Sequence, residues 1–506
     1  MKELKASEIY STVKNKGLFR CNQGTIFMPV PGQHRLWRAI AETEYIGLVR
    51  SFFDSATQSF LSSKNVSETY KRARFDPHLR ITFADQIAET RNLIRLNNGV
   101  IDLDSLRLYP FESFDLDFCY ALNFSYIANA NINVASSFLQ FVGSSLGAEE
   151  NNLPRLLEML CCIITSLKKK TSFLFYGPSN SGKSVMIEFL ARIFFPSSAV
   201  SAVPLENFSN NFALADMRTA KIDLCTEVSE DAFKHPATVR AFKQIVARET
   251  LVVANKHEKG FASRFDMTLV MCSNRILSIK ADDLDAILNR IEVLVFSTGI
   301  PQEMQDPHLL EKLWYERDII LSSALNRLPI LRSNLFKLTQ TISSFNYMQD
   351  YWATSVFAKI MDYINVACVK NIVGKVPTKL LYEGYCIFCE ENGYSAGVSR
   401  EQFTKYVKTL TGLKKQKARF GTKTVQAFVG IELRAEYLPE IANRALPVEV
   451  VTAAAIPARD IINPFFDMRV EHQRQIERGD YLGDHPENAT ADCPIYRISC
   501  GKEKEI

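Results

Sequence analysis

Residues 171–194 read TSFLFYGPSNSGKSVMIEFLARIF, and this stretch decides the fold of the chain. The apolar run 173–176 predicts a buried strand, and the spacing of apolar residues after Ser184 predicts a helix. Between them lies a complete G-x-x-x-x-G-K-S phosphate-binding loop, made of Gly177, Pro178, Ser179, Asn180, Ser181, Gly182, Lys183 and Ser184. Its glycines let backbone amides approach phosphate oxygens at the positive end of the helix. We therefore expect ATP at residues 177–184, with Lys183 on the β- and γ-phosphates and Ser184 on Mg²⁺.

The bulk composition is that of a globular protein with several domains. The 506 residues are 47% hydrophobic and 23% charged, and a chain of this length exceeds one typical core. No apolar run is long enough to span a bilayer, and the N-terminus has no signal-peptide core. The eleven scattered cysteines suit reduced thiols. We expect an intracellular protein without a membrane partner.

Secondary-structure signals divide the chain into four parts. Residues 171–300 alternate strands and helices, which predicts an α/β fold with a mainly parallel sheet. Asn97-Asn98-Gly99 predicts a hairpin in the mixed N-terminal part, and two helices are expected further on, at 309–328 (stopped by Pro329) and 351–369. The expected domains are an N-terminal module (1–140), an ATPase domain (141–345), a helical linker with a basic unit (346–435) and a partly ordered tail (436–506).

Two later strands of the expected sheet end in polar residues. KIDLCTEVSED places Glu227 at the end of a buried strand, where a carboxylate could polarise an attacking water, although Glu227 could also only cap or solvate a loop. Asp223 is a weaker rival as the acid near the metal, because it sits in mid-strand. TLVMCSN then ends in Asn274, which could hold the water or contact the γ-phosphate; alone, such an asparagine is usually a turn former.

Two basic features are each weak indications of function when taken alone. Arg290 precedes another apolar strand and is either an ordinary rim arginine or, in a ring, a group that stabilises transition-state charge in the neighbouring subunit. The stretch ARETLVVANKHEKGFASRFD, residues 247–266, predicts a hairpin whose tip carries Lys256 and His257. Such a tip is usually just a solvated turn.

The segment 375–434 is strongly basic. It holds eleven Lys or Arg and five Glu, a surplus of six positive charges, whereas the whole chain has a net charge of +4. Two helices followed by a basic turn and a strand have the outline of a winged helix. A solvated basic face on a small helical lid is the alternative. The candidate DNA contacts are Lys405, Lys408, Lys414, Lys415, Lys417, Arg419 and Lys423.

Taken in order, these motifs resemble the superfamily 3 helicases, an AAA+ group found in small DNA viruses, phages, plasmids and poxviruses. GPSNSGKS corresponds to motif A, KIDLCTEVSE to motif B with Glu227, TLVMCSN to motif C with Asn274, and Arg290 to the arginine finger. Lys256 and His257 fall where the family carries a hairpin that grips single-stranded DNA in the ring channel. LIRLNNGVIDLDSLRLYPF resembles the N-terminal module of the poxvirus and satellite-phage primase-helicase branch. The resemblance implies an AAA+ P-loop core, a mixed α+β N-terminal module and a winged-helix-like C-terminal domain.

Three departures from that family are visible. Thr226 stands where many relatives have a second acid, so Mg²⁺ is expected to rest on Ser184 and water. Asn289 stands where close relatives often have arginine. Relatives of the branch often carry an upstream primase domain, which we do not expect here. The first 130 residues hold no carboxylate and histidine set suited to nucleotidyl transfer, so primase activity is not expected on this chain.

The resulting expectation is an ATP- and Mg²⁺-dependent replicative DNA helicase of a virus, plasmid or other mobile element. It would act in the host cytoplasm or an organelle as a homo-oligomer, expected to be a hexamer, on single-stranded and forked DNA. A separate primase and replication-origin DNA are expected partners. Two other readings stay open: an origin-binding initiator scaffold whose ATP site controls assembly without processive unwinding, and an RNA-dependent motor.

Overall fold

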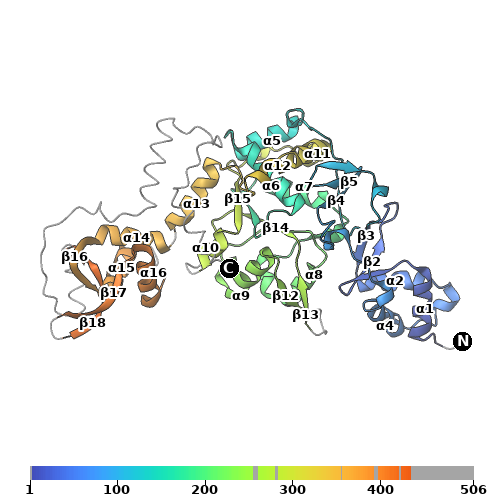
Figure 1. Cartoon of the computed structure of the whole chain (residues 1–506), viewed down its shortest axis with the longest axis horizontal. Helices are drawn as coiled ribbons and strands as arrows, with labels where there is room; N and C mark the ends of the chain where they lie inside the picture. The colour runs from blue at the N-terminus through green and yellow to red at the C-terminus, as the bar shows by residue number, and fades with distance from the viewer. Residues whose placement is uncertain are drawn as a thin grey trace. The chain divides into compact units, whose positions relative to one another are not determined.

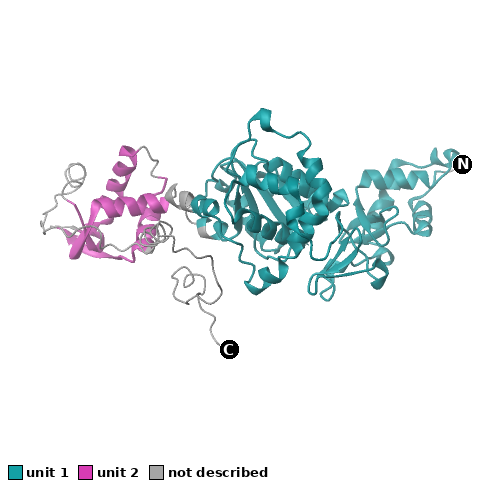
Figure 2. Ribbon diagram, turned by 90° about the horizontal axis from the view of Figure 1, so that it is seen from above, with its two compact units in different colours: residues 1–351 teal, residues 352–506 magenta. Residues whose placement is uncertain are grey.

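The computed structural model describes residues 3–254, 260–279, 283–354, 356–392, 397–420 and 423–434. The chain forms two compact units, Met1–Tyr351 and Trp352–Ile506 (Figure 2). The first unit therefore contains both segments for which the sequence predicts separate domains, residues 1–140 and 141–345. The predicted tail, 436–506, lies outside the described residues, as do Lys256 and His257 of the predicted hairpin tip.

The first unit begins with a small subdomain of helices over a short antiparallel sheet. Its helices pack around a core that includes Ile9, Tyr45 and Val66, each with no exposed surface. Gly17, in the left-handed conformation, ends the helix of residues 6–16. The Ser62 hydroxyl caps the helix of residues 63–73. The elements are α1 (Ala6–Lys16), β1 (Arg20–Asn22), β2 (Thr25–Pro29), β3 (Trp37–Ile40), α2 (Glu42–Ser51), α3 (Ser55–Gln58) and α4 (Ser63–Ala73). Two short 3-10 turns follow, η1 (Pro77–Leu79) and η2 (Ala84–Gln86).

A second sheet joins this subdomain to the rest of the unit. The predicted hairpin is confirmed, because β4 (Leu93–Leu96) and β5 (Gly99–Asp102) pair antiparallel across Asn97-Asn98. The sheet continues with β6 (Arg107–Tyr109), β7 (Ala121–Leu122) and β9 (Phe194–Phe195), in the order β6-β5-β4-β7-β9. Because β9 directly follows the helix after the phosphate-binding loop, the N-terminal segment and the central domain share one sheet. Two further 3-10 turns are η3 (Phe111–Ser113) and η4 (Ile132–Val134).

The central domain is built on a parallel sheet of five strands (Figure 1). Its order is β10 (Val200–Ser201), β11 (Ile222–Cys225), β14 (Thr268–Ser273), β8 (Ser172–Tyr176) and β15 (Ile291–Val295), and all four pairings are parallel. The predicted parallel α/β sheet is therefore confirmed. Strand β14 is inserted between β8 and β11, so the ends of all three meet at one edge. Parallel sheets of this kind bind ligands at the carboxyl ends of the strands.

Helices cover both faces of this sheet and complete its core. They are α5 (Ser136–Leu146), α6 (Asn152–Thr165), α7 (Lys183–Ile193), α8 (Asn211–Asp216), α9 (Pro236–Val246), α10 (Leu284–Leu288), α11 (Leu309–Leu325), α12 (Leu328–Ser333) and α13 (Ile342–Thr354). Short turns lie at η5 (Ser197–Ala199), η6 (Leu205–Ser209), η7 (Ala232–Lys234) and η9 (Gln302–Met304). Pro329 does not stop a helix as predicted. It lies in the first turn of α12, where a backbone N–H has no partner within the helix, so proline is tolerated there.

The hairpin predicted within residues 247–266 is present. Strands β12 (Thr250–Val253) and β13 (Phe261–Arg264) pair antiparallel and form their own two-stranded sheet. Leu251 and Val253 are buried on one face, whereas Val252 and Arg264 are exposed. The stem of the hairpin is thus anchored on the central domain through its apolar face.

The second unit has the predicted sequence of two helices and a basic hairpin, with one strand added. It consists of α14 (Val356–Ala367), β16 (Cys368–Pro377), α15 (Thr378–Glu391), α16 (Arg400–Thr411), β17 (Lys414–Phe420) and β18 (Lys423–Leu433). Its sheet has the order β16-β18-β17 and is antiparallel. The helix predicted at 351–369 is divided differently: α13 runs to Thr354, α14 starts at Val356, and Cys368 already belongs to β16.

Candidate nucleotide-binding site

The phosphate-binding loop runs from Gly177 to Ser184 between β8 and α7, and its geometry requires two glycines. Gly177 has φ +154°, and a Cβ placed there would lie 2.0 Å from the Phe296 carbonyl oxygen. Gly182 has φ +94°, and a Cβ there would lie 2.7 Å from the Phe141 ring and 2.8 Å from Ser145 Oγ. A side chain at Gly177 would displace the Phe296 backbone, and one at Gly182 would displace the Phe141 and Ser145 side chains. The loop is therefore packed tightly against these neighbours.

Lys183 is the first residue of α7 and lies folded over the loop. Its Nζ donates hydrogen bonds to the carbonyl oxygens of Gly177 at 2.8 Å and Pro178 at 2.6 Å. The residue is only 7% exposed, and this burial lowers the pKa of its ammonium. Phosphate oxygens are stronger acceptors for an ammonium than these carbonyls. Ser184, the next residue, is exposed in the first turn of α7, so its hydroxyl is accessible to a cation at the phosphates.

Asn274 is brought to the loop by the insertion of β14 beside β8. Its amide Nδ2 lies 3.5 Å from Ser179 Oγ, and the side chain is exposed. Ser273 holds this turn in place: its carbonyl accepts from the Gly177 amide at 3.2 Å, and its hydroxyl bonds the Val228 carbonyl at 3.3 Å. The ends of β8, β14 and β11 are thus linked by hydrogen bonds through one serine.

Glu227 follows the last residue of β11 by two positions and is exposed. The next amide, that of Val228, donates to the Cys272 carbonyl at 2.8 Å, so the turn that carries Glu227 is fixed to β14. Because β14 separates β11 from β8, Glu227 lies across Asn274 from the phosphate-binding loop. An exposed carboxylate at this edge is available to accept a proton from water.

Asp223 has a structural environment that differs from that of Glu227. It is fully buried in β11, and its carboxylate accepts from Ser201 Oγ at 2.6 Å and the Val203 amide at 3.0 Å. Burial raises the pKa of this carboxyl group. Both partners belong to the β10 side of the sheet, so Asp223 joins β10 to β11 and is turned away from the loop.

Arg290 lies at the opposite end of the sheet from the loop. It directly precedes β15, and its carbonyl accepts from the amide of Ser172, the first residue of β8, at 2.7 Å. The five residues of β8 separate this end from Gly177 by about 16 Å at 3.3 Å per residue. The half-buried Arg290 side chain donates to the Ala286 carbonyl. Arg290 is thus not brought together with the loop of its own chain.

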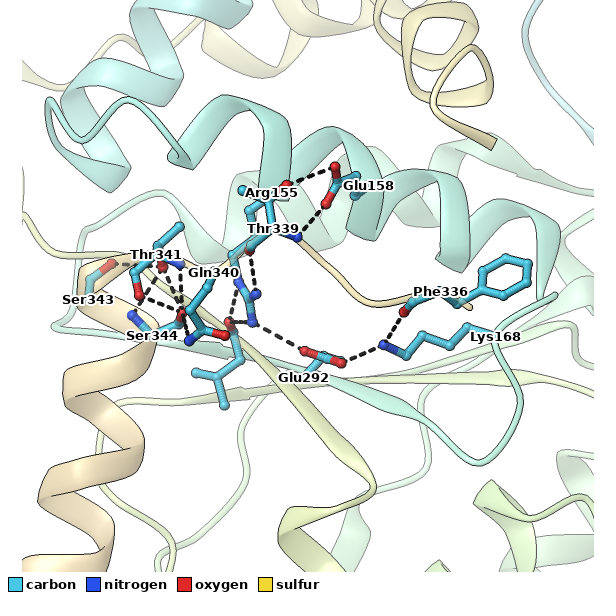
Figure 3. Close-up of polar contacts among 11 residues, drawn as sticks. Arg155, Glu158, Lys168, Glu292, Phe336, Thr339, Gln340, Thr341, Ser343 and Ser344 are labelled. Carbon is cyan, nitrogen blue, oxygen red and sulfur yellow. Dashed lines mark hydrogen bonds and ion pairs between the residues drawn. The ribbon is translucent and has the colours of Figure 1, made fainter. Parts of the chain in front are cut away.

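A buried polar network lies beside β15 (Figure 3). Arg155 on α6 is 3% exposed; it donates to the Val293 carbonyl at 2.7 and 3.0 Å and to the Thr339 carbonyl at 2.8 Å. Its guanidinium also pairs with Glu292 at 3.3 Å, and Glu292 in turn pairs with Lys168. The network holds α6, β15 and the segment before α13 together.

Beyond this network, β15 continues into a segment that packs on the loop. The Phe296 amide donates to the Tyr176 carbonyl at 2.7 Å, and the Ile300 amide donates to the Asn180 carbonyl at 3.0 Å. Sequence reasoning missed these supporting residues. The available signal was the pair of charges Arg155 and Glu158 inside the otherwise apolar helix pattern PRLLEMLCC.

The candidate DNA contacts of the second unit lie on its surface. Lys405 and Lys408 are exposed on α16, whose opposite face buries Phe403 and Val407. Four further cations are exposed along β17, and Lys423 begins β18. The four cations on β17 are Lys414, Lys415, Lys417 and Arg419.

Two comparisons with families apply to separate parts of the chain. Residues 175–290, which contain the whole candidate site, match a family of unknown function (DUF5906). Residues 358–445 match the family described as poxvirus D5 protein-like. The second match covers the basic unit and not the site. No curated protein matches the chain.

Among solved structures, the chain is similar to the apo structure of the NrS-1 C terminal region, with 13% identity and a TM-score of 0.47. That similarity covers 85% of this chain and 100% of that one. The A form apo structure of the same region has 11% identity and a TM-score of 0.46, with 84% and 100% covered. Among the helices of the described segments, none has the length and apolar character needed to cross a membrane.

Proposed function

We propose that the chain is an ATP-hydrolysing motor of the superfamily 3, AAA+ type that acts on DNA in the replication of a virus or other mobile element. The observation that carries this proposal is the shared edge of β8, β14 and β11, where Asn274 lies 3.5 Å from Ser179 of the loop and the turn after β11 carries the exposed Glu227. Residues 177–184 bind the triphosphate, Lys183 holds the β- and γ-phosphates, and Glu227 orients and deprotonates the attacking water. Ser184 would hold Mg²⁺, which would supply positive charge beside the phosphates.

The place of Arg290 supports assembly into a ring. An arginine about 16 Å from its own loop cannot contact the nucleotide that this loop binds. In a head-to-tail ring the same arginine can reach the site of the next subunit and stabilise charge there. We propose a hexamer with its ATP sites at subunit interfaces.

The second unit is proposed to be a winged-helix-like domain that contacts DNA. Its two helices, its antiparallel sheet and the exposed cations of α16 and β17 support this role. The match of residues 358–445 to the poxvirus D5 protein-like family agrees with the resemblance of the ATPase motifs to the primase-helicase branch.

The test is hydrolysis of ATP with and without single-stranded DNA, followed by strand separation of a fork. We expect DNA to stimulate hydrolysis. We expect Lys183→Ala and Glu227→Gln each to lower the rate by on the order of 10²-fold or more, since each removes a charge from the reacting centre. Arg72→Ala, on the exposed face of α4, is the matched control and should leave the rate unchanged.

An origin-binding scaffold is the second candidate, favoured by the separate basic unit with its own fold. Such a protein would hydrolyse ATP without stimulation by single strands and would bind one duplex sequence tightly. Absence of stimulation together with sequence-specific duplex binding would reject the motor.

A further inference from the structure

A polar cavity of about 370 Å³ lies within the first unit, away from the nucleotide site. The β1–β2 turn and the segment around η2 form one wall, and the loop before β11 forms another. The third wall is the end of β13, the outgoing strand of the β12–β13 hairpin, which contributes Arg264. The cavity therefore joins the N-terminal strands to the stem of the hairpin.

Polar contacts hold the walls of the cavity, one of them between two walls and one within the wall formed by the β1–β2 turn and η2. Lys221, at the start of β11, forms an ion pair with Asp85 of η2. Burial alone would lower the pKa of Lys221, but the neighbouring Asp85 carboxylate raises it, so the ammonium stays charged. Asn22 and Gln86 exchange two amide hydrogen bonds, of 2.7 and 3.0 Å. The cavity walls are thus fixed by specific polar contacts within the first unit.

The rim of the cavity is cationic. Its two lining carboxylates already have partners, since Asp85 pairs with Lys221 and Asp266 pairs with Arg248 at 2.8 Å. Arg91 and Arg264 line the cavity and are exposed. Within the described residues, neither of these arginines forms an ion pair. An anion entering the cavity would meet both guanidinium groups.

The volume of the cavity and the residues that line it indicate which class of anion could bind there. Its volume is at the lower end of the range for small-molecule sites, so it can take a nucleotide-sized segment but not a duplex. The lining aromatic rings, Phe27 and Phe83, are 4% and 1% exposed and cannot stack on a base. Recognition by exposed arginines without stacking rings is recognition of phosphate and not of base sequence.

We propose that Arg91 and Arg264 bind the phosphodiester backbone of single-stranded DNA at the base of the β12–β13 hairpin. This contact rests on the proposed DNA motor and adds a binding site to it. Its residues differ from Lys256 and His257 and from the candidate DNA contacts of the second unit. Because the site lies on the hairpin stem, a bound DNA strand would run along the N-terminal β-strands of the first unit.

The test measures how the affinity for a labelled oligo-deoxythymidine strand depends on salt, using the full chain without nucleotide. The test variant is the double substitution Arg91→Ala with Arg264→Ala. The control is Lys71→Ala with Arg72→Ala, which removes two exposed cations from α4 outside the cavity. Thermal unfolding of each variant checks that it is folded.

Each phosphate contact on a single strand contributes about 0.7 to the slope of log affinity against log salt. We expect the test variant to bind more weakly and its slope to be less steep by about 1.4 between about 50 and 200 mM salt. The control should keep the wild-type slope. A strand of mixed sequence should show the same difference, because the arginines contact the backbone.

The outcomes separate this inference from the proposed function. A folded test variant with the wild-type slope, in a protein whose hydrolysis is stimulated by DNA, overturns the cavity site alone. A wild-type chain without ATP hydrolysis overturns the proposed motor instead. If inorganic phosphate raises the unfolding temperature of the wild type and the control but not of the test variant, while all three bind the strand with the same salt dependence, the cavity is a site for free phosphate and the strand is rejected.

Discussion

The ring of Tyr347 packs against the ring of Tyr176, with 4.5 Å between the ring centroids and 57° between their planes. Tyr176 is the last residue of β8, directly before Gly177, and Tyr347 lies on α13. The Tyr347 hydroxyl also hydrogen-bonds the backbone of Leu277, three residues after Asn274. One side chain of α13 thus contacts both segments that carry the candidate site. Because α13 contacts both segments, we expect a change in this helix to alter the loop.

Substitution of Tyr347 should disturb both stability and nucleotide binding. We expect Tyr347→Ala to cost about 3 kcal/mol of unfolding free energy, because a ring that is 95% buried is lost. The KM for ATP should rise at the same time. Tyr347→Phe keeps the ring pair and should cost only about 1 kcal/mol. Denaturant unfolding and steady-state ATP hydrolysis measure the two effects; an unchanged KM in the folded alanine variant would show that α13 is not coupled to the loop.

Gly177→Ala should destabilise the protein by at least about 2 kcal/mol, because the added Cβ would lie 2.0 Å from the Phe296 carbonyl oxygen. The matched control is Gly143→Ala inside α5, where nothing lies within 4 Å of the added atom. That change should be neutral or stabilise the helix by up to about 1 kcal/mol. Equal unfolding midpoints for the two variants would contradict the tight packing of the loop.

The local elements of the candidate site could be predicted from sequence because each has a short-range signal. The loop has fixed glycine spacing, and the strands before Glu227 and Asn274 are short apolar runs bounded by polar residues. The order of the strands has no such signal, since it depends on pairing between distant segments. The insertion of β14 between β8 and β11, which places Asn274 at the loop, therefore comes only from the structure.

Other misses have identifiable causes. Strand β16 was not predicted because its register is interrupted between Lys370 and Lys375, which leaves Ile372 and Val373 exposed and breaks the alternation expected of a strand. Pro329 was taken as a stop although proline is also favoured in a first helical turn. The partners of Arg155 lie more than 130 residues away in sequence, so no local pattern could indicate them.

Arg155→Met should be among the most destabilising single changes in the first unit. It leaves the Val293 and Thr339 carbonyls and the Glu292 carboxylate without their buried donor, at a cost of about 3 kcal/mol or more. The control Arg332→Met breaks the more exposed pair with Asp104 and should cost less than about 1 kcal/mol. Urea unfolding measures both. Similar losses would mean that the network in Figure 3 contributes no more than a surface ion pair.

Acid should loosen the N-terminal subdomain through Asp76. Partial burial alone would raise the pKa of Asp76, but hydrogen bonds from the Tyr10 hydroxyl and the His78 amide, together with the Lys14 ammonium, lower it to about 2. A carboxyl group whose pKa is lowered on folding stabilises the fold above its ordinary pKa of about 4, and this contribution is lost as pH falls from about 4 to about 2. Asp76→Asn should remove that part of the pH dependence. Glu112→Gln, an exposed control, should keep it, and identical acid unfolding curves for both variants would reject the role of Asp76.

Mixing of two inactive variants tests whether Arg290 acts on the neighbouring subunit. Lys183→Ala disables the site of its own chain, whereas Arg290→Ala is expected to disable the site next door, because Arg290 lies at the far end of β8 from its own loop. In randomly mixed rings, about a quarter of the interfaces combine an intact loop with an intact arginine, so ATP hydrolysis should partly return. A mixture of Lys183→Ala with Glu227→Gln is the control and should stay inactive, since both changes lie on the nucleotide-binding side of each interface. Full activity of Arg290→Ala alone, or no recovery in the first mixture when the variants are shown to assemble together, would contradict action on the neighbour.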